Sequence, residues 1–455
     1  MDHPQHNGGR SAQVFRALRH RNYRLFFGGQ LISLIGTFLT NTAMIWLAFT
    51  LSPDPAKKAW LIGVVAFASQ IPVLFLGPIC GVWVDRLNRQ KLLVITQTAS
   101  MLQSFALAYL SFTHQIHIPT AISLAALQGI INSMDIPGRQ AFLVEMITDR
   151  QDLANAIALN STMVHGARLI GPAIAGLLIG WLGIGWCFLL DATSYLAVIA
   201  ALLAMRIQPR TPRRPASVLT ELREGFAYVR GFRPARVLLV LMAIFSLSGI
   251  PAMMVLMPIF GSHFGGSAHG AQVFGFLSGA FGLGALIGAI SLASRRTVVG
   301  LGRMIGISSV VYALAIAGFA LSPLLWISLL IVPFAGWGMI TNFASTNTIL
   351  QTLVDDDKRG RLMSFFAMAF MGMVPFGVLI AGALASHLSP GADPIVGARR
   401  TILIAAVVCL AASFRYWMVM PELRKIVRPI YIQRGILPQI AEGLQVTGAA
   451  TQAEA

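Results

Sequence analysis

Three charged side chains lie inside long apolar stretches of this sequence, where charge is rare. Asp135 and Asp191 carry carboxylates that can take up and release a proton, and Arg168 carries a guanidinium that can bind an anion. A charged residue at the centre of a bilayer costs about 2.5–3.5 kcal/mol even on lenient insertion scales, so such groups face protein or water and mark ion or substrate paths. We therefore expect proton transfer and anion recognition from these residues.

Arg168 is the deepest of the three. It lies about 13 residues into its apolar stretch, roughly 20 Å along a helix, which is too far for its head group to reach the membrane surface. Asp191 is the carboxylate expected at the most similar depth, and Asp135 is expected near the inner surface. Two roles stay open for Arg168. Either it binds an anionic substrate or tunes a proton-carrying carboxylate, or it caps carbonyls freed by Pro172 and holds helices together.

Uncharged polar residues accompany these charges. The first apolar stretch carries more polar atoms than a lipid-facing helix tolerates without partners. These residues are Gln30, Ser33, Thr37, Thr40, Asn41 and Thr42. The fourth stretch ends in a polar, small-residue segment that includes Asn132. We take Asn41 and Asn132, with the three charged residues, as candidates for a cavity that serves binding or coupling.

Other chemistries lack their residues in this sequence. No Ser/His/Asp set and no metal-ligand cluster is placed on one side of the membrane, and the cysteines Cys80, Cys187 and Cys409 lack metal-ligand spacing. No Gly-x-x-x-x-Gly-Lys-Ser/Thr phosphate loop occurs, so ATP is not the expected energy source. The sequence predicts no enzyme, no cofactor and no bound metal.

The elements that position these residues are membrane helices. Of the 455 residues 56% are hydrophobic and only 11% are charged, which is more apolar surface than one soluble core can bury. Runs of about 20 apolar residues recur, each long enough to cross roughly 30 Å of hydrocarbon as a helix. We predict an all-α membrane protein with twelve transmembrane helices, near 24–51, 60–84, 92–113, 118–138, 155–180, 186–205, 237–260, 272–294, 304–321, 324–346, 362–388 and 399–420.

The net charge of +17 does not indicate a nucleic-acid partner, because the basic residues gather neither on one face nor in one tail. With the amino terminus inside, the outside loops hold only Lys57, Lys58, Arg399 and Arg400, as the positive-inside rule requires. Residues 1–23 contain no apolar core, so no cleavable signal peptide is expected. We expect a multi-pass protein of the plasma (inner) membrane with both termini cytoplasmic.

The two halves of the chain read as diverged copies. Residues 63–91 are echoed by 275–303, and 143–155 by 350–362. Parallel six-helix repeats of this kind place a substrate site near the midplane between the halves. The expected divisions are a cytoplasmic segment with an interfacial helix at 1–23, a six-helix bundle at 24–206, a cytoplasmic linker with an amphipathic helix at 207–236, a second bundle at 237–421 and a cytoplasmic tail at 422–455.

One turn between two apolar stretches has a specific pattern of glycine and charge. Its residues are Gly81, Asp85, Arg86 and Arg89. A simple positive-inside turn would explain the arginines but neither Gly81 nor Asp85. The spacing Gly-x-x-x-Asp-Arg-x-x-Arg resembles the loop signature of the major facilitator superfamily of secondary transporters. This resemblance implies that Asp85 contacts the start of the eleventh helix, near Gly360 and Arg361, and latches the cytoplasmic side shut.

A narrower resemblance covers residues 18–205. Gly171, Pro172 and Gly176 resemble the Gly-Pro motif in the fifth helix of facilitator-family exporters, with Ala175–Gly176 in place of its closing Gly-Gly. The Asn-Tyr-Arg-Leu-Phe run at 22–26 and the Asp-x-Pro-x-Arg-Gln run at 135–140 resemble the enterobactin-exporter-like branch. That branch implies efflux of an organic molecule driven by proton entry. The fourth-helix Arg that often accompanies proton-coupled members would fall at Ala125.

These observations together predict a monomeric secondary transporter that exports a small organic molecule, siderophore-like or drug-like, by alternating access. Protons are the expected coupling ion, and the lipid bilayer is the expected surrounding. Two other functions stay open. A lipid or lysolipid flippase would show a side opening in place of a closed polar cavity. A membrane receptor that keeps the fold without moving solute would bind its ligand without counterflow in proteoliposomes.

Overall fold

Every regular element of the described chain is helical. The computed structural model describes residues 16–84, 86–147, 149–206, 229–295, 297–354, 356–389 and 393–434. The helices in these ranges are η1 (Arg16–Arg19), α2 (Arg21–Leu51), η2 (Pro55–Lys57), α3 (Lys58–Val84), α4 (Arg89–Phe112), α5 (Ile118–Glu145), α6 (Arg150–Trp181), α7 (Ile184–Ala204), α9 (Arg233–Ile244), η3 (Phe245–Gly249), α10 (Ile250–Ala293), α11 (Leu301–Leu321), α12 (Leu325–Leu353), α13 (Asp356–Ala367), η4 (Met368–Gly372), α14 (Val374–His387) and α15 (Pro394–Gln433). The predicted all-α class is confirmed.

Ten stretches of the described residues are long and apolar enough to cross a membrane. One of them, Arg233–Ala293, has 61 residues, and as one straight helix it would measure about 90 Å, three times the thickness of the hydrocarbon. It turns back at Gly266, whose φ of 62° is a left-handed conformation that glycine adopts readily. The polar helix α5 is not among the ten. A multi-pass membrane protein is thus confirmed, and the count of twelve spans stays a prediction.

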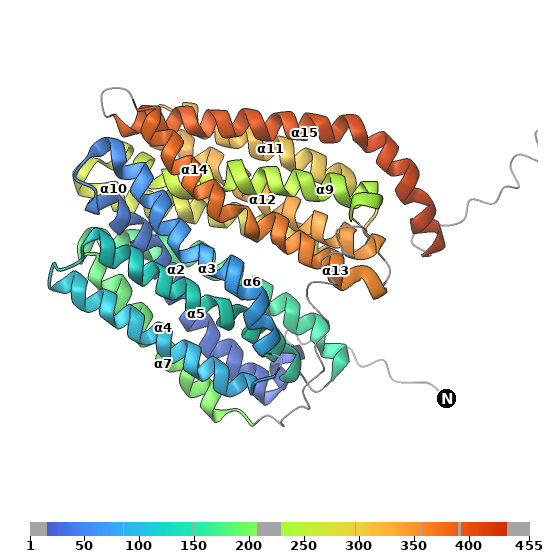
Figure 1. Cartoon of the computed structure of the whole chain (residues 1–455), viewed down its shortest axis with the longest axis horizontal. Coiled ribbons are helices and arrows are strands. Elements are labelled where there is room, and N and C mark those ends of the chain that lie inside the picture. The colour runs from blue at the N-terminus through green and yellow to red at the C-terminus, as the bar shows by residue number, and fades with distance from the viewer. Residues whose placement is uncertain are drawn as a thin grey trace, which may run out of the picture.

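The helices form two groups (Figure 1). We call α2–α7 the first group and α9–α15 the second group. The groups touch where α3 meets α14 and where α6 meets α10. At the first junction a Cβ atom on Gly63 would lie 2.7 Å from the carbonyl oxygen of Val378, and one on Gly382 would lie 2.6 Å from that of Ala59. Backbone therefore packs directly on backbone there, as small residues allow between membrane helices.

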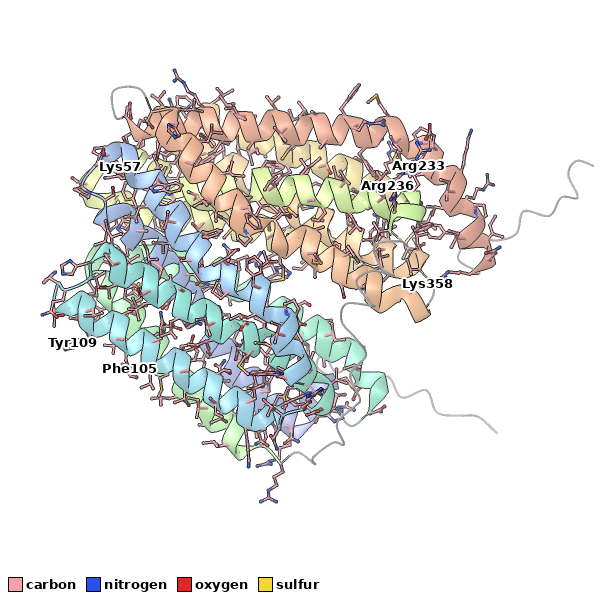
Figure 2. All side chains as sticks on the ribbon, in the orientation of Figure 1. Lys57, Phe105, Tyr109, Arg233, Arg236 and Lys358 are labelled. Atoms are coloured by element: carbon pink, nitrogen blue, oxygen red, sulfur yellow. The ribbon has the colours of Figure 1, made fainter. Side chains whose placement is uncertain are left out.

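The contact between the groups lies toward one end of the molecule. Lys57 marks this end, and Arg233, Arg236 and Lys358 mark the other (Figure 2). We call these the Lys57 end and the basic end. The helices of the two groups diverge toward the basic end (Figure 1). On α3, a Cβ on Gly77 or Gly81 would meet no described atom within 4 Å. The groups are thus closed against each other at the Lys57 end and apart at the basic end.

The amino-terminal segment is attached to the start of α6. Ala17 is completely buried, and its backbone N–H donates to Asn155 Oδ1 at 2.9 Å. The carboxylate of Asp152 forms an ion pair with Arg16 and lies 2.9 Å from His20 Nε2. The Tyr23 hydroxyl donates to the carbonyl of Ala156 at 2.9 Å. Residues 16–19 form the short helix η1, which packs on protein, and the interfacial position expected for this segment stays a prediction.

We expect Asp152→Asn to lower the melting temperature of the purified protein at neutral pH. The hydrogen bond from His20 and the charge of Arg16 lower the pKa of Asp152 below its ordinary value of 3.8. A lowered folded-state pKa means that the ionised carboxylate stabilises the fold above that ordinary value, and that this contribution is lost as the pH falls through the folded-state pKa. The difference in melting temperature between wild type and Asp152→Asn should therefore disappear as the pH is lowered.

Lys57→Gln provides the control, because it removes one charge from an exposed pair with Asp54 that contributes little to stability. Melting curves across a pH series measure both variants. If the melting temperature of Asp152→Asn stayed below that of wild type by the same amount down to pH values well below 3.8, ionised Asp152 would not be the stabilising group.

Candidate functional site

Arg168 lies where α2, α6 and α10 meet. Its guanidinium contacts the ring of Phe38 on α2, with Cζ 5.7 Å from the ring centroid, which is within cation–π range. Its backbone lies against α10, since a Cβ on Gly282 would be 2.9 Å from the Arg168 carbonyl oxygen. Among the described residues the guanidinium makes no hydrogen bond and no ion pair. Its N–H groups are therefore available to an acceptor that is not part of the described chain.

A neighbour of Arg168 extends this donor site. His165 lies one turn earlier on α6, and its buried Nδ1 has no hydrogen-bond partner among the described residues. A Cβ on Gly166 would meet nothing within 4 Å, so there is open space beside α6 at this level. Asn41 follows Phe38 by one turn on α2 and is exposed, and no contact in the described chain joins it to Arg168. We call His165 and Arg168 the donor cluster. It lies at the boundary between the closed Lys57 end and the open basic end.

Asp191 of α7 is fully enclosed and does not pair with Arg168. Its Oδ2 accepts from the Ser104 hydroxyl at 2.8 Å, whereas its Oδ1 has no hydrogen-bond partner among the described residues. A Cβ on Gly36 would lie 2.7 Å from that Oδ1. Gly36 and Phe38 point to opposite sides of α2, because two residues turn a helix by about 200°. Helix α2 thus stands between Asp191 and Arg168.

Asp135 of α5, by contrast, has partners for both oxygens. Its Oδ1 accepts from the Thr96 hydroxyl at 2.9 Å and from Gln97 Nε2 at 2.7 Å. Its Oδ2 forms an ion pair with Arg139, one turn along, because α5 continues through Pro137 to Glu145. These partners offset the cost of burying the charge of the Asp135 carboxylate.

The polar face of α4 connects the two carboxylates and was not predicted from the sequence. Thr96 and Gln97 lie beside Asp135, Ser104 lies beside Asp191, and Ser100 lies between them. Gln128 of α5 donates to Ser100 at 3.3 Å and to Asn132 at 3.1 Å. Asn132 is therefore part of this internal network and not of the donor cluster. The signal was present as polar residues three and four positions apart along one apolar stretch.

The expected latch is only partly described. Asp85 and the side chain of Arg361 lie outside the described part of the chain, and Gly360 is described only as part of α13. The latch therefore stays a prediction. Arg86 is exposed. Arg89 forms an ion pair with Glu145 at 2.6 Å and donates to the Ala141 carbonyl at 3.4 Å. The turn between α3 and α4 is thereby attached to the end of α5.

The glycines of the expected exporter motif lie in tight helix contacts. A Cβ on Gly171 would overlap Phe38 of α2. A Cβ on Gly176 would lie 2.8 Å from the Cα of Gly275, and a Cβ on Gly275 would lie 2.7 Å from the carbonyl oxygen of Pro172. Gly176 and Pro172 therefore form a close backbone contact between α6 and α10. This contact lies between the donor cluster and the Lys57 end.

Comparison with known proteins identifies similar chains over nearly the full length. Residues 12–425 match the family described as "Transmembrane secretion effector". The staphyloferrin A transporter of Staphylococcus aureus is 25% identical over 401 residues, which are 86% of this chain and 95% of that protein. The enterobactin exporter EntS of Escherichia coli is 23% identical over 392 residues, which are 86% of this chain and 92% of that protein.

Solved structures share the fold at lower identity. The nucleoside transporter NupG superposes with a TM-score of 0.69 at 15% identity and covers 89% of this chain and 99% of its own. A bacterial homologue of the human lysosomal transporter Spinster, in an inward-facing and occupied conformation, superposes with a TM-score of 0.67 at 15% identity. The superposition covers 88% of this chain and 97% of that protein. At these identities the likeness concerns the fold alone.

We expect Gly176→Ala to weaken the closure of the Lys57 end, because the added Cβ forces α6 and α10 apart. Overpacking of this kind costs about 1–3 kcal/mol, and the cost applies only to the closed arrangement. Spin labels at Lys57 and His269, both exposed, report the separation of the two groups. The variant should show longer distances than wild type.

The matched control is Gly166→Ala on the same helix, where a Cβ meets nothing within 4 Å. It should give the wild-type distance distribution. Identical distributions for both variants would show that the Gly176 contact does not control closure.

Proposed function

Because the chain belongs to the transmembrane secretion effector family, a group of major facilitator transporters, we propose that it exports a small siderophore-like organic anion in exchange for protons. The chain is a multi-pass membrane transporter for a small organic molecule, as its relatives are. The name of one relative refers to staphyloferrin A and that of another to enterobactin export. These names support an outward direction and a siderophore-like substrate.

The observation that carries the proposal is the unpaired guanidinium of Arg168. A buried or half-buried arginine normally has acceptors, since leaving a charged donor without them is costly. Arg168 has the Phe38 ring and no acceptor among the described residues. His165 adds a second buried nitrogen without a partner. An anionic substrate that enters from the basic end would supply the missing acceptors at this point.

Asp191 supports the proton step. A carboxylate buried without a cation carries a large desolvation cost, which proton binding removes. Among the described residues Asp191 accepts from the Ser104 hydroxyl on Oδ2 and lies beside the Thr40 hydroxyl, but it has no cation. Asp135 has Arg139, Thr96 and Gln97. We therefore assign proton binding to Asp191 and a structural role to Asp135. Helix α2, which touches Asp191 through Gly36 and Arg168 through Phe38, would connect proton and substrate.

The movement we propose is rocking of two bundles, residues 24–206 and 237–421, joined by the linker at 207–236. Contacts at the Lys57 end, such as Gly176 with Gly275, hold the arrangement that is open at the basic end. The latch at Asp85 would hold the opposite arrangement. The basic end faces the cytoplasm in this proposal, because lysine and arginine accumulate on the cytoplasmic side of membrane proteins. Both termini then lie in the cytoplasm, and the transporter acts as a monomer in the inner membrane.

Arg168→Lys should lower transport about ten- to a hundredfold while the protein keeps its melting temperature. Lysine preserves the charge but lacks the planar fork of donors, and hydrogen bonds to a charged group are worth about 1.5–3 kcal/mol. Enterobactin and staphyloferrin A serve as probes in inverted vesicles, with the transport rate measured per folded molecule. Arg400→Lys, an exposed position at the Lys57 end, is the matched control.

Two results would contradict the role of Arg168. Full transport by Arg168→Lys would show that its donor geometry is unnecessary. A loss of melting temperature with unchanged rate per folded molecule would assign Arg168 to helix packing instead. Binding of a probe without counterflow in wild type would favour a receptor, and movement of lysolipid would favour a flippase.

Asp191→Asn should abolish the dependence of transport on a pH gradient, because the amide cannot exchange a proton, and should leave substrate counterflow in place. Asp135→Asn should instead lower the melting temperature by breaking a buried ion pair, a change that costs about 3–5 kcal/mol. Transport with and without an imposed gradient distinguishes the two. Gradient-driven transport that survives in Asp191→Asn would exclude this residue as the proton carrier.

A further inference from the structure

A pocket opens at the basic end of the second group, away from the donor cluster. Its volume is about 340 Å³, and it lies between the starts of α9 and α11 and the ends of α12 and α15. Leu238, Ile349, Leu353 and Leu423 form its apolar floor. Three arginines also line it, Arg303 on α11 and Arg424 and Arg428 on α15, and all three are exposed. The pocket thus combines a strongly basic rim with a hydrocarbon interior.

The positive charge of the rim is not neutralised within the described chain. Arg303, Arg424 and Arg428 take part in no ion pair or hydrogen bond there. Glu422, the acidic residue nearest in sequence, is paired with Arg233. Helix α11 begins at the pocket with Gly300 as its N-cap, which provides no side-chain cap, so its amino-terminal dipole adds to the positive potential. The rim therefore favours an anionic ligand.

A comparison of the two halves explains why this space exists. When residues 63–91 are aligned with their repeat at residues 275–303, Gln90 corresponds to Gly302 and Lys91 to Arg303. Gln90 in the first half donates to the carbonyls of Leu202 and Met205, at 2.6 and 3.2 Å, and so fills the space at the end of α7. Gly302 has no side chain with which to do this, and its carbonyl accepts from the Tyr416 hydroxyl at 2.8 Å instead. The second half keeps the basic residue, and the pocket lies beside it.

The shape of α15 extends the pocket from the membrane surface into the bilayer. This helix has 40 residues, about 60 Å at 1.5 Å per residue, so it projects beyond the hydrocarbon. Met420, Leu423 and Val427 share one face of it, and Arg424 and Arg428 flank that face. A second groove of about 280 Å³ lies deeper between α9 and α15. Its lining is mainly apolar, with Val240, Ile244 and Val419 among others, and it also includes Arg236 and Arg415. Apolar surface therefore continues from the basic rim toward the bilayer centre.

We propose that this pocket binds an anionic phospholipid of the cytoplasmic leaflet, with its phosphate between Arg303, Arg424 and Arg428. Its acyl chains lie on the apolar floor and along the groove between α9 and α15. A lipid fits because the site requires an anion and hydrocarbon on the same molecule, and because the basic end faces the leaflet in which basic pockets meet anionic head groups. The bound lipid fills the space that Gln90 fills in the first half.

The test compares lipids on the purified full-length protein by native mass spectrometry. Wild type should retain dioleoylphosphatidylglycerol in preference to dioleoylphosphatidylcholine. Each arginine near a membrane surface contributes about a fivefold preference for anionic lipid. The triple variant Arg303→Gln, Arg424→Gln and Arg428→Gln should therefore bind phosphatidylglycerol roughly a hundredfold more weakly. Lys425→Gln, at an exposed position of α15 outside the pocket, should bind like wild type.

A second variant tests the pocket without changing its charge. Gly302→Gln gives the second half the glutamine that the first half has as Gln90. The new Cβ would meet only the Tyr416 hydroxyl at 3.5 Å, an ordinary contact. The variant should fold and lose the lipid. Glycerol 3-phosphate, which has the anion without acyl chains, should not compete with phosphatidylglycerol.

Three results would overturn the proposal. One is equal retention of the two phospholipids by wild type. Another is wild-type binding of phosphatidylglycerol by both the triple variant and Gly302→Gln. The third is displacement of the lipid by glycerol 3-phosphate at equal concentration, which would assign the site to a soluble phosphate compound.

Discussion

Direct contact between the backbones of α6 and α10 determines where everything else in this molecule lies. Hydrocarbon solvates apolar side chains as well as another helix does, so helices associate in a membrane through close packing and polar contacts. At Gly176 and Gly275 each missing side chain lets the other helix approach, with hypothetical Cβ atoms less than 3 Å from the opposite backbone. The carbonyl of Arg168 lies against α10 in the same way, at Gly282, and the donor cluster is therefore placed by this contact.

A second constraint acts on the polar interior of the first group. Unpaired buried polar groups are costly, and both carboxylates have hydrogen-bond donors on α4, to which Asp135 adds Arg139 of its own helix. Asp135 obtains a full set and Asp191 a partial one. The difference between two residues of the same type therefore arises from neighbours. Asp135 has partners for both oxygens, whereas Oδ1 of Asp191 has no hydrogen-bond partner among the described residues.

The sequence predicted the helical class and the family, because hydrophobic length and the glycine and charge motifs are local signals. It placed Arg168 deep in the membrane on the same grounds. It could not show that Arg168 and Asp191 lie on opposite sides of α2, since that depends on how three helices rotate about their axes. The ion pair between Asp135 and Arg139 requires α5 to continue through Pro137, a residue type that usually interrupts a helix, and sequence alone does not show that it does. Ser104 and His165 were overlooked because their importance comes from buried neighbours far along the chain.

The attachment of the amino terminus has a consequence for the order of events during synthesis. Arg16 and His20 are bound by Asp152, which follows His20 by 132 positions. Ribosomes add about 5–20 residues per second, so Arg16 emerges roughly 7–27 s before its partner exists. The ion pair between Arg16 and Asp152 can therefore form only after the start of α6 has been made. The position of the amino-terminal segment on the protein is thus fixed by residues that are synthesised long after it.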